Sequence, residues 1–254
     1  MLNAVTRGVS PQICNCELTY VPRQPIDPEK ARRQHRAYEQ CLEELGLRIV
    51  PLPAEPGLAD CVFVEDTAVV TDEVAVITHM GARTRRPEVW LTAETLSGFR
   101  PLEFINARGG TLEGGDVMRI GRTFYVGVST RTNADGIAQL RKILGPYDYQ
   151  VVPVEVTGCL HLKTACTYLN RNTILANPSW ADMSPFRGFD IVETFPSEQW
   201  GANSLSVGDS VILPASAPRT ADALRERGFN VLTLDISELE KAEAGLTCMS
   251  IVFS

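Results

Sequence analysis

Five short segments of the sequence place a reactive or hydrogen-bonding side chain just before a run of apolar residues. They supply acids, an imidazole, a carboxamide and a thiol, in chain order Glu65 with Asp66, Glu113, His161, Asn203 and Cys248. A thiol and an imidazole, with a carboxylate to orient the imidazole, form the general arrangement for nucleophilic catalysis by cysteine. Taken alone, Cys248 has the plainer reading of a buried core thiol, because Leu, Met and Ile surround it. The position that the five segments share favours a common site instead.

Three carboxylates beside a thiol indicate a cationic substrate. On their own, Glu65, Asp66 and Glu113 would raise the pKa of the Cys248 thiol and oppose its ionisation. A guanidinium donates paired hydrogen bonds to carboxylates in a fork geometry. At about 4 Å from the sulfur, its charge would contribute roughly 4 kcal/mol at an effective dielectric constant of about 20, equivalent to about three pKa units in favour of the thiolate. We therefore expect a guanidino substrate that helps to ionise its own nucleophile.

The same segments introduce a repeated unit of strand, strand, helix and strand. Paired β-rich runs around Gly, Asn or Asp predict hairpins at 66–78, 116–127, 166–177 and 205–214. Helix-start residues and apolar spacings of three and four predict helices at 87–99, 133–145 and 218–229, whereas the helix around 180–188 is poorly marked. A further strand follows each helical or irregular stretch.

The two ends of the chain supply a fifth unit. The strand 249–254 would pair with 3–7, and the helix 28–46 and the strand 47–53 would follow. Repeats of this length are typical of ring architectures that leave no exposed sheet edge. We predict an α/β fold with one domain over residues 1–254, a five-bladed pseudo-symmetric propeller, in which the five entrances meet at one pocket. An open α/β sandwich with another strand order is the alternative.

Composition excludes several other classes of protein. A net charge of −7 without a Lys/Arg run argues against nucleic-acid binding. The apolar stretches are strand-sized, far below the roughly 20 residues that span a membrane, and the first residues lack the order of a signal peptide. Seven cysteines without framework spacing and three scattered histidines predict reduced thiols and no structural zinc. We expect a cytoplasmic protein.

Six motifs, in order along nearly the whole chain, resemble the dimethylarginine dimethylaminohydrolase family of guanidino-modifying enzymes, in the pentein superfamily. The motifs are DCVFVEDTAVV (60–70), GARTRRPE (81–88), TLEGGDV (111–117), TRTNADG (130–136), LHLKT (160–164) and LTCMS (246–250). The family fold is a five-fold α/β propeller. The resemblance implies hydrolysis of Nω-methylated L-arginine to L-citrulline and the methylamine through a covalent thiouronium on cysteine, without a metal or organic cofactor.

The resemblance also implies roles for individual residues. Cys248 would be the nucleophile, His161 the general acid and base, and Glu113 would bind the guanidinium and orient the site. The other residues would bind the substrate: Glu65 and Asp66 its guanidino nitrogens, Arg85 and Arg131 its α-carboxylate, and Asp60 with the main-chain carbonyls of Leu18 and Ala242 its α-ammonium. We expect both arginines in loops near the mouth of the pocket. Leu18 lies in a segment, 14–27, that matches the family poorly, and the analogous loop acts as a lid there.

Other functions remain open on the sequence alone. A related guanidino hydrolase or deiminase could act on arginine or another guanidino amino acid, and Arg85 with Arg131 favours an amino acid over agmatine. A propeller of this kind could also be a binding module, such as a ribosome anti-association factor, and Cys14 with Cys16 could mark a redox or metal protein. The expected partner is a small-molecule guanidino amino acid, not nucleic acid or a membrane. A homodimer is compatible with the sequence.

Overall fold

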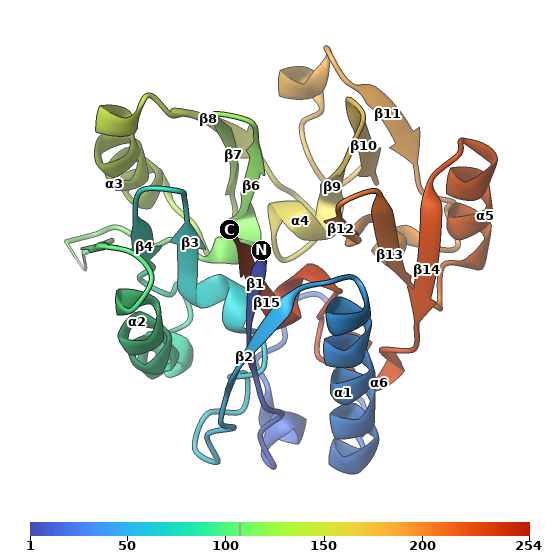
Figure 1. Cartoon of the computed structure of the whole chain (residues 1–254), viewed down its shortest axis with the longest axis horizontal. Helices are drawn as coiled ribbons and strands as arrows, with labels where there is room; N and C mark the ends of the chain where they lie inside the picture. Colours follow the sequence, from blue (N-terminus) through green and yellow to red (C-terminus); the bar gives the residue numbers. More distant parts are fainter. Residues whose placement is uncertain (107) are drawn as a thin grey trace.

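The computed structural model describes residues 1–106 and 108–254. These residues form five three-stranded sheets arranged around a common centre (Figure 1). In every sheet the middle strand runs antiparallel to one neighbour and parallel to the other. The prediction of a five-bladed α/β propeller is therefore confirmed.

Each blade is named here by its place in the chain. The closing blade contains β15 (Ser250–Phe253), β1 (Asn3–Arg7) and β2 (Arg48–Leu52). The second blade contains β3 (Ala68–Val70), β4 (Ala75–Ile77) and β5 (Leu102–Phe104), and the third contains β6 (Val117–Ile120), β7 (Thr123–Val128) and β8 (Gln150–Glu155). The fourth blade contains β9 (Cys166–Asn170), β10 (Thr173–Ala176) and β11 (Asp190–Glu193), and the fifth contains β12 (Leu205–Val207), β13 (Ser210–Pro214) and β14 (Asn230–Leu234). The closing blade joins the two ends of the chain, with Asn3 opposite Phe253 and Thr6 opposite Ser250.

Four blades carry a helix between their second and third strands, on the outer side of the ring (Figure 1). These helices are α1 (Pro28–Glu44), α2 (Val89–Ser97), α3 (Ala134–Leu144) and α5 (Pro218–Glu226). Local sequence sets their starts: the Asp27 carboxylate accepts hydrogen bonds from the Glu29 and Lys30 amides, and the Asn133 side chain accepts one from the Gly136 amide. In the fourth blade the short 3₁₀ helix η6 (Ser184–Phe186) takes this place, which agrees with the weak helix signal there.

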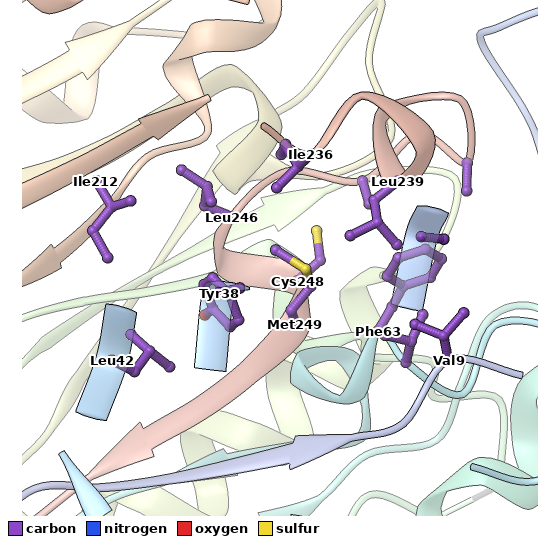
Figure 2. Packing of buried hydrophobic residues seen from close by; sticks show 14 of the residues in the cluster. Val9, Tyr38, Leu42, Phe63, Ile212, Ile236, Leu239, Leu246, Cys248 and Met249 are labelled. Carbon is purple, nitrogen blue, oxygen red and sulfur yellow. The ribbon is translucent and has the colours of Figure 1, made fainter. Parts of the chain in front are cut away.

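In the described part of the chain, the hydrophobic core is divided into five clusters, one between each pair of neighbouring blades. The largest joins α1 and the closing blade to the fifth blade. Figure 2 shows Cys248 and Met249 inside this cluster, close to Tyr38 from α1 and to Leu246. The nucleophile candidate therefore lies at the junction where the ring closes.

A short helical turn precedes the first strand of every blade. The turns are η2 (Val64–Thr67), η4 (Gly114–Asp116), α4 (Leu162–Ala165), η7 (Gln199–Ala202) and η8 (Thr247–Met249). They contact one another in sequence around the centre, since η2 touches η8 and η4, and α4 touches η4 and η7. The five entrances identified in the sequence thus meet at one end of the ring. None of the helices within residues 1–106 and 108–254 has the length and apolar character to cross a membrane.

Candidate active site

The Cys248 thiol lies on η8 and is 8% exposed. Its sulfur accepts hydrogen bonds from the Gly245 amide at 3.4 Å and from Asn203 Nδ2 at 3.8 Å. Burial, with the charges of Glu65 and Asp66, raises the pKa of Cys248 to about 12, against the opposing effects of the Gly245 amide and Lys163. Without a bound cation the thiol is neutral at pH 7, as the cluster of acids predicted.

The His161 imidazole stands at the N-cap of α4 and is also buried. Its Nε2 lies 2.8 Å from Glu113 Oε2, and its Nδ1 lies 3.9 Å from Asp66 Oδ1. Burial alone would lower the pKa of His161, but the carboxylates of Asp66, Asp116 and Glu113 outweigh burial and raise this pKa to about 9. The ring therefore carries a proton at neutral pH and can act as an acid.

Gly115 allows the entrances of the second, third and fourth blades to approach one another. Its amide donates a 2.9 Å hydrogen bond to Asp66 Oδ1. A Cβ atom at this position would lie 2.6 Å from His161 Nδ1 and 2.7 Å from Asp66 Oδ1, closer than real side chains come. The site therefore requires glycine at position 115.

Glu113 is fully buried behind the imidazole. One oxygen faces His161, and the other accepts hydrogen bonds from the amides of Gly81 at 3.0 Å and Ala82 at 3.3 Å. Despite burial, the neighbouring His161 holds the pKa of Glu113 below its usual value. Glu113 is not among the residues that line the pocket at Cys248, so the geometry supports orientation of the ring more directly than contact with a guanidinium.

Glu65 connects the site to the axis of the propeller. Its carboxylate accepts hydrogen bonds from Lys163 Nζ and, at 2.7 Å, from Thr247 Oγ1. Burial raises the pKa of Glu65, and the positive charge of Lys163 opposes this shift. Glu65 and Lys163 both line a cavity of about 520 Å³ that the innermost strands enclose, whereas neither lines the pocket at Cys248. Sequence reasoning missed Lys163, although it stands two residues after His161 in the LHLKT motif.

Arg85 is not in a loop at the mouth, and that expectation is wrong. It lies in the 3₁₀ helix η3 (Arg83–Glu88) and is only 3% exposed. Its guanidinium can be buried because the carboxylates of Asp66 and Glu88 balance its charge. It donates to Asp66 Oδ2 at 2.8 Å, to the Phe63 carbonyl at 3.1 Å and to the Glu88 carboxylate. Burial raises the pKa of Asp66, but His161 and Arg85 outweigh it and lower this pKa overall. Arg85 still contributes to the pocket wall.

Arg131 lines the same pocket and retains hydrogen-bonding capacity. Its Nη2 donates to Thr19 Oγ1 at 3.2 Å, and its Nη1 lies 3.6 Å from Glu113 Oε1. Among the described residues, the buried Nη1 has no hydrogen-bond partner. An unpaired buried donor is costly, so a carboxylate that reached this nitrogen would be bound favourably.

The segment 13–25, called the lid below after the resemblance, includes η1 (Ile13–Asn15) and contributes Glu17 to the lining of the pocket. Asp60 accepts a hydrogen bond from the Glu17 amide, and the Glu243 carboxylate accepts them from the Thr19 amide at 2.6 Å and the Tyr20 amide at 2.5 Å. Leu18, between these anchors, packs against the cluster around Cys248. The space left in the pocket is about 10 Å³, or room for about one water molecule, so a guanidino amino acid does not fit into this conformation of the site.

Sequence reasoning missed Glu243. It is 4% exposed, and its backbone has a φ of +59°, a left-handed conformation that is uncommon for a residue other than glycine. Its neighbour Ala242 lines the pocket as expected, together with Asp60, His161 and Cys248. The sequence did not indicate this conformation, because the left-handed region is typical of glycine and not of glutamate.

A cation could also be held between Asp66, Glu113 and His161. Their ligand atoms all lie within 4.8 Å of one another. In this structure the guanidinium of Arg85 and the protonated ring of His161 already balance the two carboxylates. Cys14 and Cys16 both lie in the lid as free thiols, with their main-chain carbonyls bonded to Arg23.

Known proteins resemble this chain over its whole length. The arginine deiminase family model matches residues 55–193. A dimethylarginine dimethylaminohydrolase from Pseudomonas aeruginosa is 39% identical over 229 residues, which cover 89% of this chain and 90% of that protein. The structure of a dimethylarginine dimethylaminohydrolase variant with histidine replaced by glycine, an adduct with S-methyl-L-thiocitrulline, superposes with a TM-score of 0.95 at 36% identity and covers 100% of both chains.

A second solved structure is a cysteine-to-serine mutant of the Pseudomonas aeruginosa enzyme in complex with citrulline. It has a TM-score of 0.94 and 36% identity, and the match covers 99% of this chain and 98% of that one. The five-bladed fold, the motifs and the level of identity agree with one another. The chain belongs to the dimethylarginine dimethylaminohydrolase family of the pentein superfamily.

Proposed function

We propose that this chain hydrolyses the guanidino group of Nω-methylated L-arginine, releasing L-citrulline and methylamine or dimethylamine. The observation that carries the proposal is the convergence of a buried thiol, a protonated imidazole and buried carboxylates on one closed pocket. The relatives with this fold include an adduct with S-methyl-L-thiocitrulline, an isothiourea analogue of arginine, and a complex with citrulline, which is the product of the proposed reaction.

The residues around the pocket divide the substrate between them. Asp66, in the pocket wall, holds the guanidino nitrogens, whereas Glu65, bonded to Thr247 beside Cys248, acts on the guanidinium through its charge, and Glu113 acts through His161. Arg131, supported by Arg85, receives the α-carboxylate. The α-ammonium is bound by Asp60 and by the main-chain carbonyls of Leu18 and Ala242. The unpaired Arg131 Nη1 and the position of Asp60 and Ala242 in the pocket wall support this assignment.

The reaction proceeds in two steps on one nucleophile. The positive charge of the substrate favours the Cys248 thiolate, which attacks the guanidinium carbon. Protonated His161 gives its proton to the leaving amine, and an S-alkylthiouronium on Cys248 remains. The neutral imidazole then takes a proton from water, whose attack on the same carbon releases citrulline and restores the thiolate. The lid excludes bulk water from the first step.

The same proposal includes residues 1–254 as one domain that needs no metal or organic cofactor, located in the cytoplasm. A guanidino amino acid is its small-molecule partner. The homodimer, and the absence of nucleic-acid or membrane partners, stay predictions.

A panel of substrates tests the proposal. Release of the ureido product is measured with four substrates: citrulline from asymmetric dimethylarginine, monomethylarginine and arginine, and N-carbamoylputrescine from agmatine. We expect turnover of the methylated arginines, and loss of turnover in Cys248→Ser and Cys248→Ala without loss of the folded state by circular dichroism. Substantial activity in either variant would contradict the role of Cys248. Preferred release of ammonia from arginine would favour a deiminase, the alternative that the arginine deiminase family model keeps open.

A further inference from the structure

We infer that Asn203 is a positioning residue for the nucleophile, and that its carboxamide holds the sulfur of Cys248 and favours the thiolate form. The inference rests on the proposed function, in which Cys248 attacks the substrate. Asn203 stands at the entrance of the fifth blade, the position at which the other blades carry their acids, imidazole and thiol.

Both ends of the Asn203 amide are bonded to the segment that carries the nucleophile. The side chain is 3% exposed. Its Nδ2 donates to Cys248 Sγ over 3.8 Å, and its Oδ1 accepts a 3.0 Å hydrogen bond from the Thr247 amide. The Thr247 hydroxyl donates in turn to Glu65. A single side chain therefore fixes the sulfur and the backbone just before it, and links both to the carboxylate of the second blade.

Gly245 holds this amide in place. A Cβ atom at residue 245 would lie only 2.1 Å from Asn203 Cγ, so the carboxamide is packed directly against the main chain and glycine is required there. The Gly245 amide itself donates to Cys248 Sγ at 3.4 Å. Two N–H donors, one from a side chain and one from the backbone, thus converge on the sulfur, as donors do in sites that stabilise a developing anion.

The chemistry of the pocket explains why a carboxamide suits this position. The charges of Glu65 and Asp66 oppose ionisation of Cys248, and the charge of Lys163 favours it. The nearby Tyr38 hydroxyl is bonded to Ser250 and not to the sulfur. An N–H donor stabilises a thiolate more than a thiol. A lysine or arginine at 203 would do the same, but its positive charge would repel a guanidinium. The amide supplies the donor without the charge.

The test compares two substitutions of one residue. Asn203→Asp keeps the size and the oxygen that accepts from Thr247, but it removes the donor and adds a negative charge. Asn203→Ala removes both bonds. If the side chain served only to brace the backbone, Asn203→Asp, which keeps the bond to the Thr247 amide, would be less impaired than Asn203→Ala. If it serves the sulfur, Asn203→Asp is impaired at least as strongly.

The readout is alkylation of Cys248 by iodoacetamide in the full chain without substrate, followed by mass spectrometry between pH 7 and pH 10. We expect about tenfold slower alkylation at pH 8 in both variants, the equivalent of about one pKa unit, and a similar fall in kcat/KM for dimethylarginine. Gly245→Ala, which must displace the amide, provides a second route to the same loss if a variant at 203 does not fold.

Asn230→Asp is the matched control, because Asn230 bonds Ser210 at the far end of the fifth blade. It should leave alkylation and turnover unchanged. Alkylation and turnover of Asn203→Asp within about twofold of the wild type would overturn the inference. If the wild-type chain hydrolysed none of the four substrates, the proposed function would be wrong. The alkylation rates would still test the role of Asn203, because alkylation needs no substrate.

Discussion

The carboxylate of Glu113 and the imidazole of His161 form one buried pair, with Oε2 and Nε2 2.8 Å apart. Main-chain amides of Gly81 and Ala82 hold the other carboxylate oxygen, so the acid cannot turn away from the ring. Together with Asp66 and Asp116, this acid raises the pKa of His161 to about 9 against the effect of burial. The proton that the leaving amine needs is therefore present before the substrate arrives.

Replacing Glu113 with Gln should lower the pKa of His161, because the charge that stabilises the imidazolium is removed. The protonated fraction then falls at neutral and alkaline pH, and kcat should drop by about a hundredfold, within the range for general acid catalysis. The alkaline limb of the pH–kcat profile should also move to lower pH. An unchanged alkaline limb would contradict the role of Glu113.

Replacing Lys163 with Met should raise the pKa of Glu65 further, because Lys163 is its positive partner. A larger fraction of Glu65 would then be protonated at any given pH, so substrate affinity should fall, and activity should recover as the pH rises. Loss of one member of this mostly buried pair should also lower stability by about 3 kcal/mol. Steady-state kinetics between pH 6 and pH 9 and chemical denaturation measure the two effects. Lys142→Met, on the exposed face of α3, should change neither.

Replacing Arg131 with Gln should weaken binding of the substrate carboxylate. A lost hydrogen bond between charged groups corresponds to about 10- to 100-fold in KM for methylarginine. Any residual turnover of agmatine, which has no carboxylate, should change much less. The surface substitution Arg187→Gln serves as the control. Equal loss for both substrates would mean that Arg131 acts elsewhere, for example through Glu113 at 3.6 Å.

Replacing Glu243 with Gln should loosen the lid, because a neutral amide oxygen is a weaker acceptor for the Thr19 and Tyr20 amides. We expect about tenfold faster hydrogen exchange at these two amides and a raised KM, with a smaller change in kcat. Exchange measured by mass spectrometry on peptides from the lid checks this. The exposed Glu226→Gln should show wild-type exchange, and wild-type exchange in Glu243→Gln would argue against the anchor.

Replacing Gly115 with Ala should damage the site, since the added methyl group would press on His161 and Asp66. A cost of about 1–3 kcal/mol in stability is typical of such overpacking, and kcat should fall as the imidazole moves. Gly188→Ala adds the same methyl group where nothing lies within 4 Å. It should leave melting temperature and activity unchanged. Equal behaviour of the two variants would show that the close approach at Gly115 does not matter.

Much of the architecture could be predicted because it depends on local patterns. Hairpin turns, helix caps such as Asn133 and the shared position of Glu113, His161 and Cys248 are all readable in a single chain. The directions of side chains at the entrances are not. Arg85 was expected at the mouth but turns inward, since Asp66 and Glu88 neutralise it there.

The residues that anchor the lid, and the axial cavity, were also not predictable from the sequence. The bonds from Glu243 to the lid join residues more than two hundred positions apart, and no periodicity reports them. Lys163 stood inside a recognised motif, but its partner Glu65 was assigned to the substrate alone. Contacts between different repeats depend on the rotation of each helical turn, which composition and spacing do not determine.

The pairing of β15 with β1 has a consequence for folding kinetics. Thr6 and Ser250 are partners across almost the entire chain, and such distant contacts form late because loop closure is costly. Cys248 lies directly before β15, so its sulfur meets Asn203, and Thr247 meets Glu65, only when this last pairing is made. Partly folded chains, even with four blades assembled, would hold an exposed and unactivated thiol. Refolding followed by recovery of activity should therefore lag behind refolding followed by far-ultraviolet circular dichroism.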